Sequence, residues 1–583
     1  MKTKEPMSQR LVFRRLTHYL SSYKWLTVVA LTFLLLTTVV QTIIPLVAEY
    51  FIDHYIKQVS QLALLILLGY FLLYVLQMIF SYVGNYLFSK VAYSIVRDIR
   101  QDAFDNVQRL GMSYFDQTSA GSIVSRLTND TEAISQMFSG ILSSFISAIF
   151  IFATTLYTMI VLDIRLTAIV VLFWPFIFIL VNLYRKKSMT VIETTRSLLS
   201  DINTKLSESI EGIRVIQAFR QEERLQDEFE AINQDHLRYA NRSVLLDSIF
   251  LRPAMSLLKL LGYVVLMAYF GFTWQTIGVT AGLMYAFIQY INRLFDPLIS
   301  VTQNFSTLQT SMVSAGRVFT LIDRDDYEPQ QNNNQSLEVS RGGIEFKNVC
   351  FSYDGDHQIL DNISFKVKQG ETIAFVGATG SGKSSIINVF MRFYEFQSGQ
   401  VLLDGHDIRD YSQEELRKSV GLVLQDPFLY HGTIKSNIRM YQDISDQDVE
   451  AAAEFVDADD FIRQLPQGYD EPVTERGSTF STGQRQLLAF ARTVASQPKI
   501  LILDEATANI DSKTEDIIQT SLKKMREGRT TIAIAHRLST IQDANCIYVL
   551  DKGHIVESGN HEELLEKKGI YYRMYQLQAG MME

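Results

Sequence analysis

The 583-residue sequence is short of cysteine, and its only two cysteines, Cys350 and Cys546, both fall in the C-terminal half. No disulfide framework is indicated, and a reducing compartment is the simplest expectation. Positive charge is also in deficit, because 54 Lys and Arg residues face 63 Asp and Glu residues for a formal charge of −9. This balance argues against a nucleic-acid binder that relies on a basic surface.

Apolar sequence, by contrast, is abundant. Hydrophobic residues make up 47% of the chain, and its mean hydropathy is positive, which is unusual for a purely soluble protein. Six apolar segments precede residue 300, most of them near the roughly 20 residues that a bilayer requires. They are residues 25–52, 62–88, 137–162, 166–183, 255–272 and 277–298. The basic N-terminal 24 residues precede an apolar run too long for a signal-peptide core, so we expect a retained anchor with a cytoplasmic N-terminus.

The polar connections between these segments alternate in length. Three are short, whereas residues 90–136 and 184–253 form long connections rich in Lys and Arg, which the positive-inside rule places in the cytoplasm. Both lack clusters of Gly and Pro and keep helical spacing, so we expect the membrane helices to continue beyond the bilayer. Reversals near residues 114–121 and 208–217 could then touch a soluble domain. Soluble hairpins with only a packing role are the alternative.

Charged residues also occur within the apolar segments or near their ends. They are Glu49, Arg252, Lys259, Arg293 and Asp296. Charges at this depth are candidates for function, although snorkelling or a water-filled cavity explains most of them. Contact with a substrate and simple solvation therefore both stay open.

A change in composition near residue 323 divides the chain. Residues 323–341 are polar, contain Pro329 and a Gln/Asn run, and predict a flexible linker. We expect a transmembrane domain with six spans and two long cytoplasmic loops over residues 1–322, this linker, and an α/β domain over residues 342–583. Strand-like runs at residues 344–351, 363–367, 372–376 and 401–403 open that last domain.

The stretch 375–385 matches the pattern G-x-x-x-x-G-K-[ST], between a predicted buried strand and a helix predicted over residues 384–392. In such a loop the glycines let backbone N–H groups face phosphates, and the helix N-terminus adds partial positive charge. Lys383 would reach the β- and γ-phosphates, and the Ser384 hydroxyl would ligate Mg²⁺. The predicted nucleotide-binding residues here are Gly377, Ala378, Thr379, Gly380, Ser381, Gly382, Lys383, Ser384 and Ser385.

Two further apolar strands end in residues suited to catalysis. Residues 499–503 lead to Asp504, which can hold Mg²⁺, and Glu505, which can polarise the water that attacks the γ-phosphate. His536 follows the apolar run 531–535 and could contact the γ-phosphate or orient Glu505 and the water. Glu505 and His536 are therefore the predicted catalytic residues.

Together these motifs resemble the nucleotide-binding domain of an ATP-binding cassette (ABC) protein, with Walker A at residues 377–384 and Walker B at residues 500–505. The resemblance implies three further roles in the nucleotide site. Tyr353 would stack on adenine, Gln425 of the Q-loop would contact Mg²⁺, and Asp511 would belong to the D-loop. Residues 474–477 resemble the cross-talk loop of exporters, and residues 114–130 and 211–219 resemble the two intracellular coupling regions.

With six spans ahead of the cassette, the whole chain resembles a bacterial type I exporter half-transporter. This implies an α-helical six-span transmembrane domain fused to an α/β P-loop NTPase domain. It further implies ATP and Mg²⁺ as cofactors, a place in the plasma membrane with both termini and the nucleotide-binding domain cytoplasmic, and ATP-driven export. Hydrophobic drugs or dyes are the leading substrates by resemblance, with a lipid or lipopeptide flippase and an ATP-gated regulatory subunit as alternatives. A soluble-type cassette and an importer are disfavoured by the spans on the same chain, and the absence of an N-terminal peptidase domain disfavours a peptide-processing exporter.

The signature motif departs from the family pattern. The usual Leu-Ser-Gly-Gly-Gln is replaced by Phe480 followed by Ser481, Thr482, Gly483 and Gln484. In the family two cassettes pair head to tail, so that each signature acts on the partner's ATP, and Thr482 puts a branched side chain where glycine allows close approach. We therefore expect a non-identical partner chain with an intact signature and a degenerate Walker B glutamate or switch histidine. A homodimer that tolerates Thr482 is the alternative.

Overall fold

The computed structural model describes residues 7–55, 61–277, 280–333, 335–440, 443–474, 477–504, 512–535 and 538–578. The chain forms two compact units. The first unit contains Met1–Gln108 and Ala120–Asp323, and the second contains Arg109–Ser119 and Arg324–Glu583. The short segment Arg109–Ser119 therefore belongs with the C-terminal domain, although the helices on both sides of it belong to the first unit.

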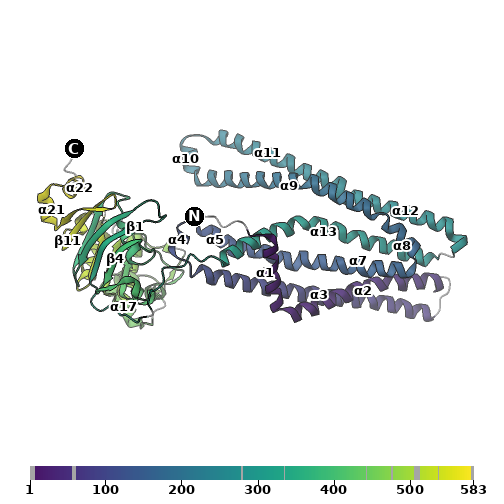
Figure 1. Ribbon diagram of the computed structural model, residues 1–583, viewed down its shortest axis with the longest axis horizontal. Helices are drawn as coiled ribbons and strands as arrows, with labels where there is room; N and C mark the ends of the chain where they lie inside the picture. The colour runs from purple at the N-terminus through teal and green to yellow at the C-terminus, as the bar shows by residue number, and fades with distance from the viewer. Residues whose placement is uncertain are drawn as a thin grey trace. The chain divides into compact units, whose positions relative to one another are not determined.

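The described part of the first unit is helical (Figure 1). Its elements are α1 (Gln9–Ser22), α2 (Lys24–Tyr55), α3 (Gln61–Val107), α5 (Ala120–Ser125), η1 (Arg126–Asp130), α6 (Thr131–Gln136), η2 (Met137–Leu142), α7 (Ser143–Leu162), α8 (Ile164–Val171), α9 (Trp174–Glu211), α10 (Ile213–Ala218), α11 (Glu222–Leu246), η3 (Asp247–Leu251), α12 (Arg252–Ile277) and α13 (Ala281–Ile322). Within the described chain, five helical runs are long and apolar enough to cross a membrane. They are Lys24–Tyr55, Gln61–Val107, Ala120–Leu162, Ile164–Glu211 and Glu222–Phe272.

These runs extend well beyond a bilayer, as the helical spacing of the long connections predicts. Four of them contain 43 to 51 residues, more than twice the roughly 20 that span the hydrocarbon core. The sixth expected span, residues 277–298, falls mainly in α13, which is not among the five. That segment includes Asn292, Arg293 and Asp296, and its role as a span stays a prediction.

Both expected reversals are present. The first joins α3 to α5 through the short helix α4 (Met112–Phe115), and the second joins α9 to α11 through α10. Figure 1 shows α9 and α11 lying side by side with α10 at their connected end. At this tip the side chains of Ile210, Val215 and Phe219 are 72%, 61% and 73% exposed. A hairpin tip this apolar is typical of a surface that another protein covers.

A proline in α2 is matched by two donors on α13. Pro45 has no N–H, so the carbonyl of Gln41, four residues earlier, cannot receive its usual helical hydrogen bond. The guanidinium of Arg293 donates to that carbonyl instead. One turn along α13, Tyr290 donates its hydroxyl to the carbonyl of Thr42 at 2.7 Å. The interruption in α2 is therefore satisfied by its neighbour, which is how transmembrane helices tolerate proline.

The second unit is built around a six-stranded sheet with the order β12-β11-β3-β10-β9-β6, accompanied by a four-stranded sheet β2-β1-β4-β5 and a small pair β7-β8. The strands are β1 (Ile344–Phe351), β2 (Leu360–Val367), β3 (Thr372–Gly377), β4 (Ser398–Leu403), β5 (His406–Asp407), β6 (Val420–Val423), β7 (Gly432–Thr433), β8 (Pro472–Val473), β9 (Ile500–Asp504), β10 (Thr530–Ile534), β11 (Cys546–Asp551) and β12 (His554–Gly559). Its helices of five residues or more are α14 (Lys383–Phe390), α15 (Gln413–Ser419), α16 (Ile434–Arg439), α17 (Asp446–Phe455), α18 (Asp459–Arg463), α19 (Thr482–Ala495), α20 (Ser512–Arg526), α21 (His561–Lys567) and α22 (Ile570–Gln578). Every strand predicted from the sequence is present.

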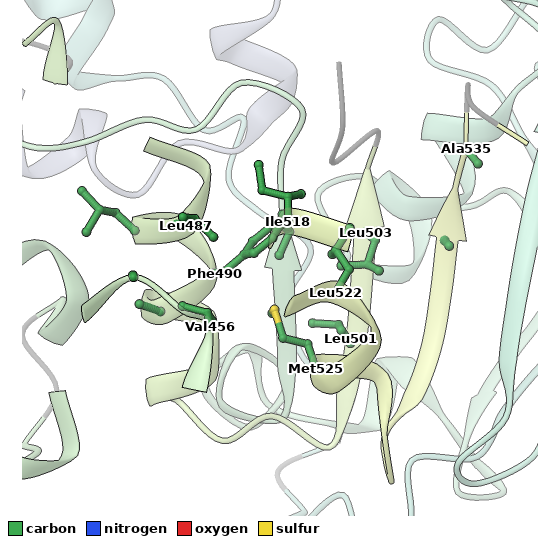
Figure 2. Close-up of a cluster of buried hydrophobic side chains, with 14 of the residues drawn as sticks. Val456, Leu487, Phe490, Leu501, Leu503, Ile518, Leu522, Met525 and Ala535 are labelled. Carbon is green, nitrogen blue, oxygen red and sulfur yellow. The ribbon is translucent and has the colours of Figure 1, made fainter. Parts of the chain in front are cut away.

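The central strands β3, β9 and β10 are buried on both faces. Their sequences are continuous apolar runs because a parallel strand covered on each side needs apolar side chains on both faces. On one face Leu501 and Leu503 of β9 pack with Leu487 and Phe490 of α19 and with α20 (Figure 2). On the other face Ile500 and Ile502 join the core beneath the four-stranded sheet and α14. Helix α19 is thus fixed against the strand that ends in Asp504.

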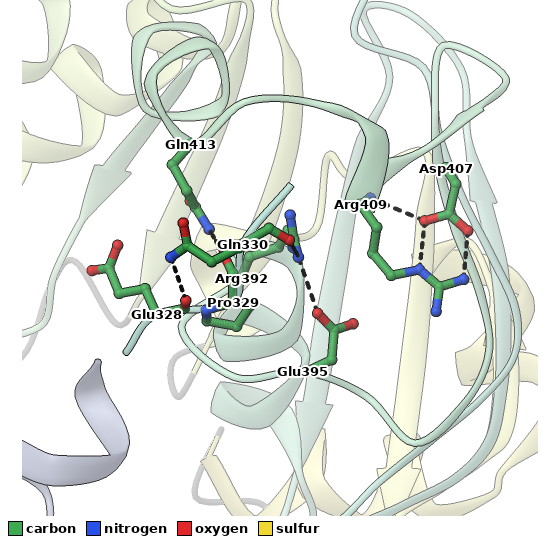
Figure 3. A network of polar contacts seen from close by, with 8 residues as sticks. All are labelled: Glu328, Pro329, Gln330, Arg392, Glu395, Asp407, Arg409 and Gln413. Atoms are coloured by element: carbon green, nitrogen blue, oxygen red, sulfur yellow. Dashed lines mark hydrogen bonds and ion pairs between the residues drawn. The ribbon is translucent and has the colours of Figure 1, made fainter. Parts of the chain in front are cut away.

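The segment expected to be a flexible linker is held to the C-terminal unit. The carbonyls of Pro329 and Gln330 accept hydrogen bonds from Gln413 and from buried Arg392, both at 2.9 Å (Figure 3). Glu328 forms an ion pair with Arg417. These residues thus have partners on the C-terminal unit, which a polar composition does not reveal, and the flexibility of the segment 323–341 stays a prediction.

Asp404 secures the end of the same segment. Its carboxylate accepts the backbone N–H groups of Ser340, Arg341 and Gly343 at 2.7, 2.8 and 2.8 Å. Burial alone would raise the pKa of this carboxyl, but the backbone donors outweigh burial and hold the pKa below its usual value. The charged form of Asp404 is thus the one that fastens residues 340–343 to β4.

Candidate nucleotide-binding and catalytic site

Four parallel strands bring the predicted site residues to one edge of the sheet. Strands β3, β10, β9 and β6 are consecutive neighbours, and Ile534 pairs in register with both Phe375 and Asp504. Their carboxyl ends therefore lie together. The loop 377–385 follows β3, Asp504 ends β9, and exposed Gln425 comes two residues after β6. Ligands of parallel α/β sheets bind at this kind of edge.

The loop between β3 and α14 has a backbone that requires glycine. Gly380 and Gly382 have φ angles of 82° and 101°, which side-chain-bearing residues rarely adopt. A Cβ atom on Gly382 would also lie 2.8 Å from Leu360 Cδ2, and one on Gly377 would lie 2.3 Å from the Leu550 carbonyl oxygen. The chain therefore curls tightly here, with Ala378, Thr379 and Gly380 exposed at the top of the loop.

Polar groups converge inside this loop. The ammonium of buried Lys383 donates to the carbonyls of Gly377 and Ala378 at 2.9 and 3.1 Å. The hydroxyl of Ser381 is buried and has no hydrogen-bond partner among the described residues. A buried polar atom left in this way is costly unless a ligand satisfies it. The hydroxyl of Ser384 is on an exposed residue in the first turn of α14, whose N-terminal N–H groups face the same loop.

These features fit a nucleoside triphosphate with Mg²⁺. The tight loop, the helix N-terminus and Lys383 supply donors and positive charge for phosphates. Ser384, Gln425 and Asp504 supply the oxygen ligands that Mg²⁺ prefers. When bound, the metal ion would neutralise charge that develops on the phosphates.

Tyr353 lies beside this loop with a partly exposed ring. Its hydroxyl is 3.1 Å from the Ser385 hydroxyl and accepts from Asn388 Nδ2 at 2.9 Å. Its ring is 43% exposed, so a flat base can still reach it. The turn after Tyr353 is fixed by Asp354, whose carboxylate accepts the backbone N–H groups of residues 356 and 357 at 2.9 Å. These bonds, led by that from residue 357, hold the pKa of Asp354 well below its usual range.

Tyr394 is a site residue that the sequence did not reveal. Its ring meets the ring of Tyr353 edge to face at 4.8 Å, and its hydroxyl donates to the carboxylate of Asp116 in the first reversal. Burial, followed by this bond to Asp116, raises the pKa of Tyr394. The backbone of the first reversal is also bonded to the segment that follows α13, because Gly111 N donates to the Asp326 carbonyl at 2.8 Å. An isolated tyrosine after a helix carries no sequence signal, so only the fold shows this contact.

The signature residues form the N-terminus of α19. Ser481 caps the helix, because its hydroxyl accepts from Gln484 N at 3.2 Å while Gln484 Oε1 accepts from Ser481 N at 3.0 Å. Thr482 is the first helical residue, and its hydroxyl accepts from Arg485 at 3.2 Å. Gly483 is buried. Ser481 is thus exposed at the helix end while its hydroxyl caps the first turn, and Thr482 follows it directly.

Three predicted residues lie outside the part of the chain that the structure describes. They are the catalytic candidates Glu505 and His536 and the D-loop residue Asp511. In the expected cross-talk loop, Glu475 and Arg476 are likewise outside it. The strands that lead to Glu505 and His536 are described, and both end at the edge that carries the loop 377–385.

Sequence comparison agrees with this arrangement. Residues 27–298 match the family described as ABC transporter transmembrane region, and residues 360–508 match the family described as ABC transporter. The chain is 74% identical to the putative ABC transporter ATP-binding protein exp8 of Streptococcus pneumoniae over 574 residues, 98% of each chain. It is 43% identical to the probable multidrug resistance ABC transporter ATP-binding/permease protein YheH of Bacillus subtilis, over 91% of this chain and 78% of that one.

A solved structure shares the fold along the whole chain. A bacterial Atm1-family ABC exporter with ATP bound matches with a TM-score of 0.74 and 30% identity, covering 95% of this chain and 98% of that one. A helical membrane domain and a fused ABC ATPase domain are therefore present on one chain. The chain belongs to the ABC transporters, as an exporter chain that couples ATP hydrolysis to transport across a membrane.

Proposed function

We propose that this chain exports hydrophobic or amphipathic compounds across the bacterial cell membrane, as one half of a heterodimeric multidrug exporter. Both termini and the nucleotide-binding domain would be cytoplasmic, with the membrane domain over residues 1–322 and the ATPase domain over residues 342–583. Support comes from the similarity to a relative named for multidrug resistance and from the apolar membrane helices.

One observation carries the coupling of ATP to transport. The first reversal, Arg109–Ser119, packs within the ATPase unit, and Asp116 accepts the hydroxyl of Tyr394, which in turn touches Tyr353. This reversal joins α3 to α5 along the chain, and both helices belong to the first unit. Any movement of the ATPase unit therefore pulls directly on two membrane helices, at a point next to the expected adenine contact.

The site residues take roles that follow from their positions. Lys383 clamps the phosphates, and Ser384, Gln425 and Asp504 hold Mg²⁺ directly or through water. Glu505 acts as general base on the attacking water, and His536 orients that water against the γ-phosphate. Closure of the two cassettes on ATP turns the cavity outward, and hydrolysis at this chain's Walker motifs resets it.

The matched pair Glu505→Gln and Glu527→Gln tests the catalytic assignment. Both changes remove one carboxylate from the ATPase domain, and Glu527 is an exposed residue after α20. Loss of the general base should lower ATP hydrolysis by about 100-fold or more with ATP binding retained. The control should stay within about twofold of wild type. Near-wild-type turnover by Glu505→Gln in the assembled transporter would refute the assignment.

One feature supports a non-identical second chain, and another supports a second chain of either kind. Thr482 places a branched side chain, bonded to Arg485, at the helix end that would face the partner's ATP. The apolar tip of the second reversal is exposed, as expected of a surface that docks on another chain. If the partner carries an intact signature, ATP at this chain's Walker motifs would contact Glu505 and His536 of this chain and the complete signature of the partner.

Stoichiometry is the decisive measurement for this assembly. The tagged chain, purified gently from its native membrane, should bring down a second ABC chain of similar size at one to one. Only this chain, as a dimer with robust ATPase activity, would show that Thr482 is tolerated and that the proposed asymmetry is wrong.

The alternatives give different transport results. A lipid or lipopeptide flippase would move labelled lipid between leaflets and would leave dyes untouched. A subunit gated by ATP would allow flux that continues when Glu505→Gln blocks hydrolysis. ATP-dependent dye uptake into inverted vesicles that stops in this variant is the result expected for a multidrug exporter.

A further inference from the structure

A groove lies between α9 and α13 in the first unit. It has a volume of about 450 Å³, within the range typical of small-molecule sites. The α9 residues that line it recur every three or four positions from Val181 to Arg196, so they form one stripe on the helix. At about 1.5 Å per residue the stripe is roughly 22 Å long. The groove can therefore hold an extended molecule along the helix axis.

The floor of the groove is apolar. Ile192 on α9 faces a cavity shared with Val301 and Phe305 on α13. Phe305 is 42% exposed although it lies in this cavity, so its ring is open to a ligand. Hydrophobic burial alone would recruit any apolar compound here. The selectivity must come from the polar groups.

Those polar groups favour an anion near the membrane end of the groove. The guanidinium of Arg185 lies over the ring of Phe305, with its central carbon 5.5 Å from the ring centre. A guanidinium held over an aromatic ring can still donate its N–H groups to a carboxylate, sulfonate or phosphate. Arg196, about 16 Å further along the helix, donates to Thr310 Oγ1 at 3.1 Å. Glu193 also lines the groove, next to Ile192 and away from Arg185, and would repel an anion from the middle of the floor.

The position of Arg185 on α9 matches the cytoplasmic surface of the bilayer. Arg185 follows the apolar part of the helix directly, and Lys186 and Lys187 come next, as expected at the cytoplasmic end of a span. An amphiphile in the inner leaflet has its anionic group at this level and its apolar body toward the membrane. Such a molecule can enter the groove with little change in depth.

We propose that the groove between α9 and α13 binds a single-chain anionic amphiphile, its anionic group on Arg185 and its apolar body along Ile192, Val301 and Phe305. This names the substrate class for the export function proposed above, on which it rests. The site discriminates by charge as well as by apolarity, so neutral analogues of the same shape bind it less tightly.

Binding of a matched pair of probes tests the proposal without ATP. The probes are 11-(dansylamino)undecanoic acid and its methyl ester, added to the assembled transporter in nanodiscs of zwitterionic lipid. Dansyl fluorescence should report a Kd at least about fivefold lower for the acid. Arg185→Gln should raise the Kd of the acid about tenfold and leave that of the ester within about twofold.

Two further variants separate the contributions. Lys186→Gln removes the same charge one residue away, outside the groove lining, and should change either Kd less than about twofold. Ile192→Ser removes apolar contact only and should weaken acid and ester by the same factor, about fivefold.

The outcomes are distinct. Equal affinity for acid and ester, an equal effect of Arg185→Gln and Lys186→Gln, or failure of both probes to bind would overturn the proposal. ATP-dependent transport of a neutral dye, measured in the same preparation, tests the export function separately. That transport can fail while selective binding of the acid persists, and it can persist while the acid shows no preference for Arg185.

Discussion

The bond between Arg293 and the carbonyl of Gln41 leads to a prediction that a double-mutant cycle can test. Pro45 deprives this carbonyl of its helical donor, and Arg293 on α13 replaces it. Removal of the guanidinium by Arg293→Gln should therefore destabilise the membrane domain. The same removal should cost little in a Pro45→Ala background, because alanine at this position restores an N–H four residues after Gln41.

The size of the expected destabilisation follows from the carbonyl of Gln41, which loses its hydrogen-bond donor. Hydrogen bonds to charged donors contribute about 1.5–3 kcal/mol in water-soluble proteins. Measured values between membrane helices are smaller, about 0.6 kcal/mol on average and about 1.7 at most. We therefore expect Arg293→Gln to cost about 1.5 kcal/mol in the native background and about 0.5 kcal/mol with Pro45→Ala. The coupling energy is then about 1 kcal/mol, above the usual error of additivity.

Unfolding of the full chain in mixed micelles, titrated with dodecyl sulfate, supplies the four free energies of the cycle. Arg317→Gln provides the control, because Arg317 lies on the same helix but pairs with Asp130, at 2.8 Å from Nε to Oδ2. It is 24 residues from Arg293, so its effect should add to that of Pro45→Ala. Additivity of Arg293→Gln with Pro45→Ala would refute the reasoning, since it would mean that the carbonyl of Gln41 does not depend on Arg293.

Three further predictions concern the second unit. Tyr394→Phe removes the hydroxyl that bonds Asp116, so the stimulation of ATPase activity by transported compounds should fall about threefold, and adding Asp116→Asn should lower it no further. Thr482→Gly should change ATP hydrolysis by the assembled heterodimer less than about twofold, because the partner's ATP lacks a competent base; a tenfold rise would contradict the asymmetry. Asp404→Asn should lower stability by about 1–2 kcal/mol at pH 7 in thermal unfolding. Because the folded-state pKa of Asp404 is lowered, its contribution is present above the unfolded value near 3.9 and is lost as pH falls through the folded pKa, so variant and wild type should converge in acid.

The cassette was the most predictable part of the molecule. The sequences of strands β3, β9 and β10 are continuous apolar runs followed by glycine, acidic residues or histidine, and both the local pattern and the burial of the strands favour the same structure. Positions in such a site also follow from topology, because carboxyl ends of adjacent parallel strands meet at one edge. The loop 377–385 and Asp504 could therefore be placed together from the sequence, whereas Gln425 was assigned to the site only by the family resemblance.

Contacts between distant segments were the least predictable. The polar residues 323–341 look alike whether they are solvated or bonded, yet the carbonyls of Pro329 and Gln330 find Gln413 and Arg392. The same limit hid Tyr394, which gains its role only because the reversal containing Asp116 packs on its domain. Composition reports the average environment of a segment, whereas a hydrogen bond depends on one pair of atoms.

The packing of α19 constrains how the two ATP sites of a dimer can differ. Leu487 and Phe490 fix the inner face of α19 against Leu501 and Leu503, so the N-terminus of α19 and the carboxyl end of β9 move as one body (Figure 2). In head-to-tail dimers of the family, the first of these ends serves the partner's ATP and the second serves the chain's own. Closure at one site therefore carries the other with it, and a difference in hydrolysis between them cannot arise from independent movement. In the proposed heterodimer it would arise from local chemistry, namely the defective base expected on the partner together with Thr482 beside the Ser481 cap on this chain.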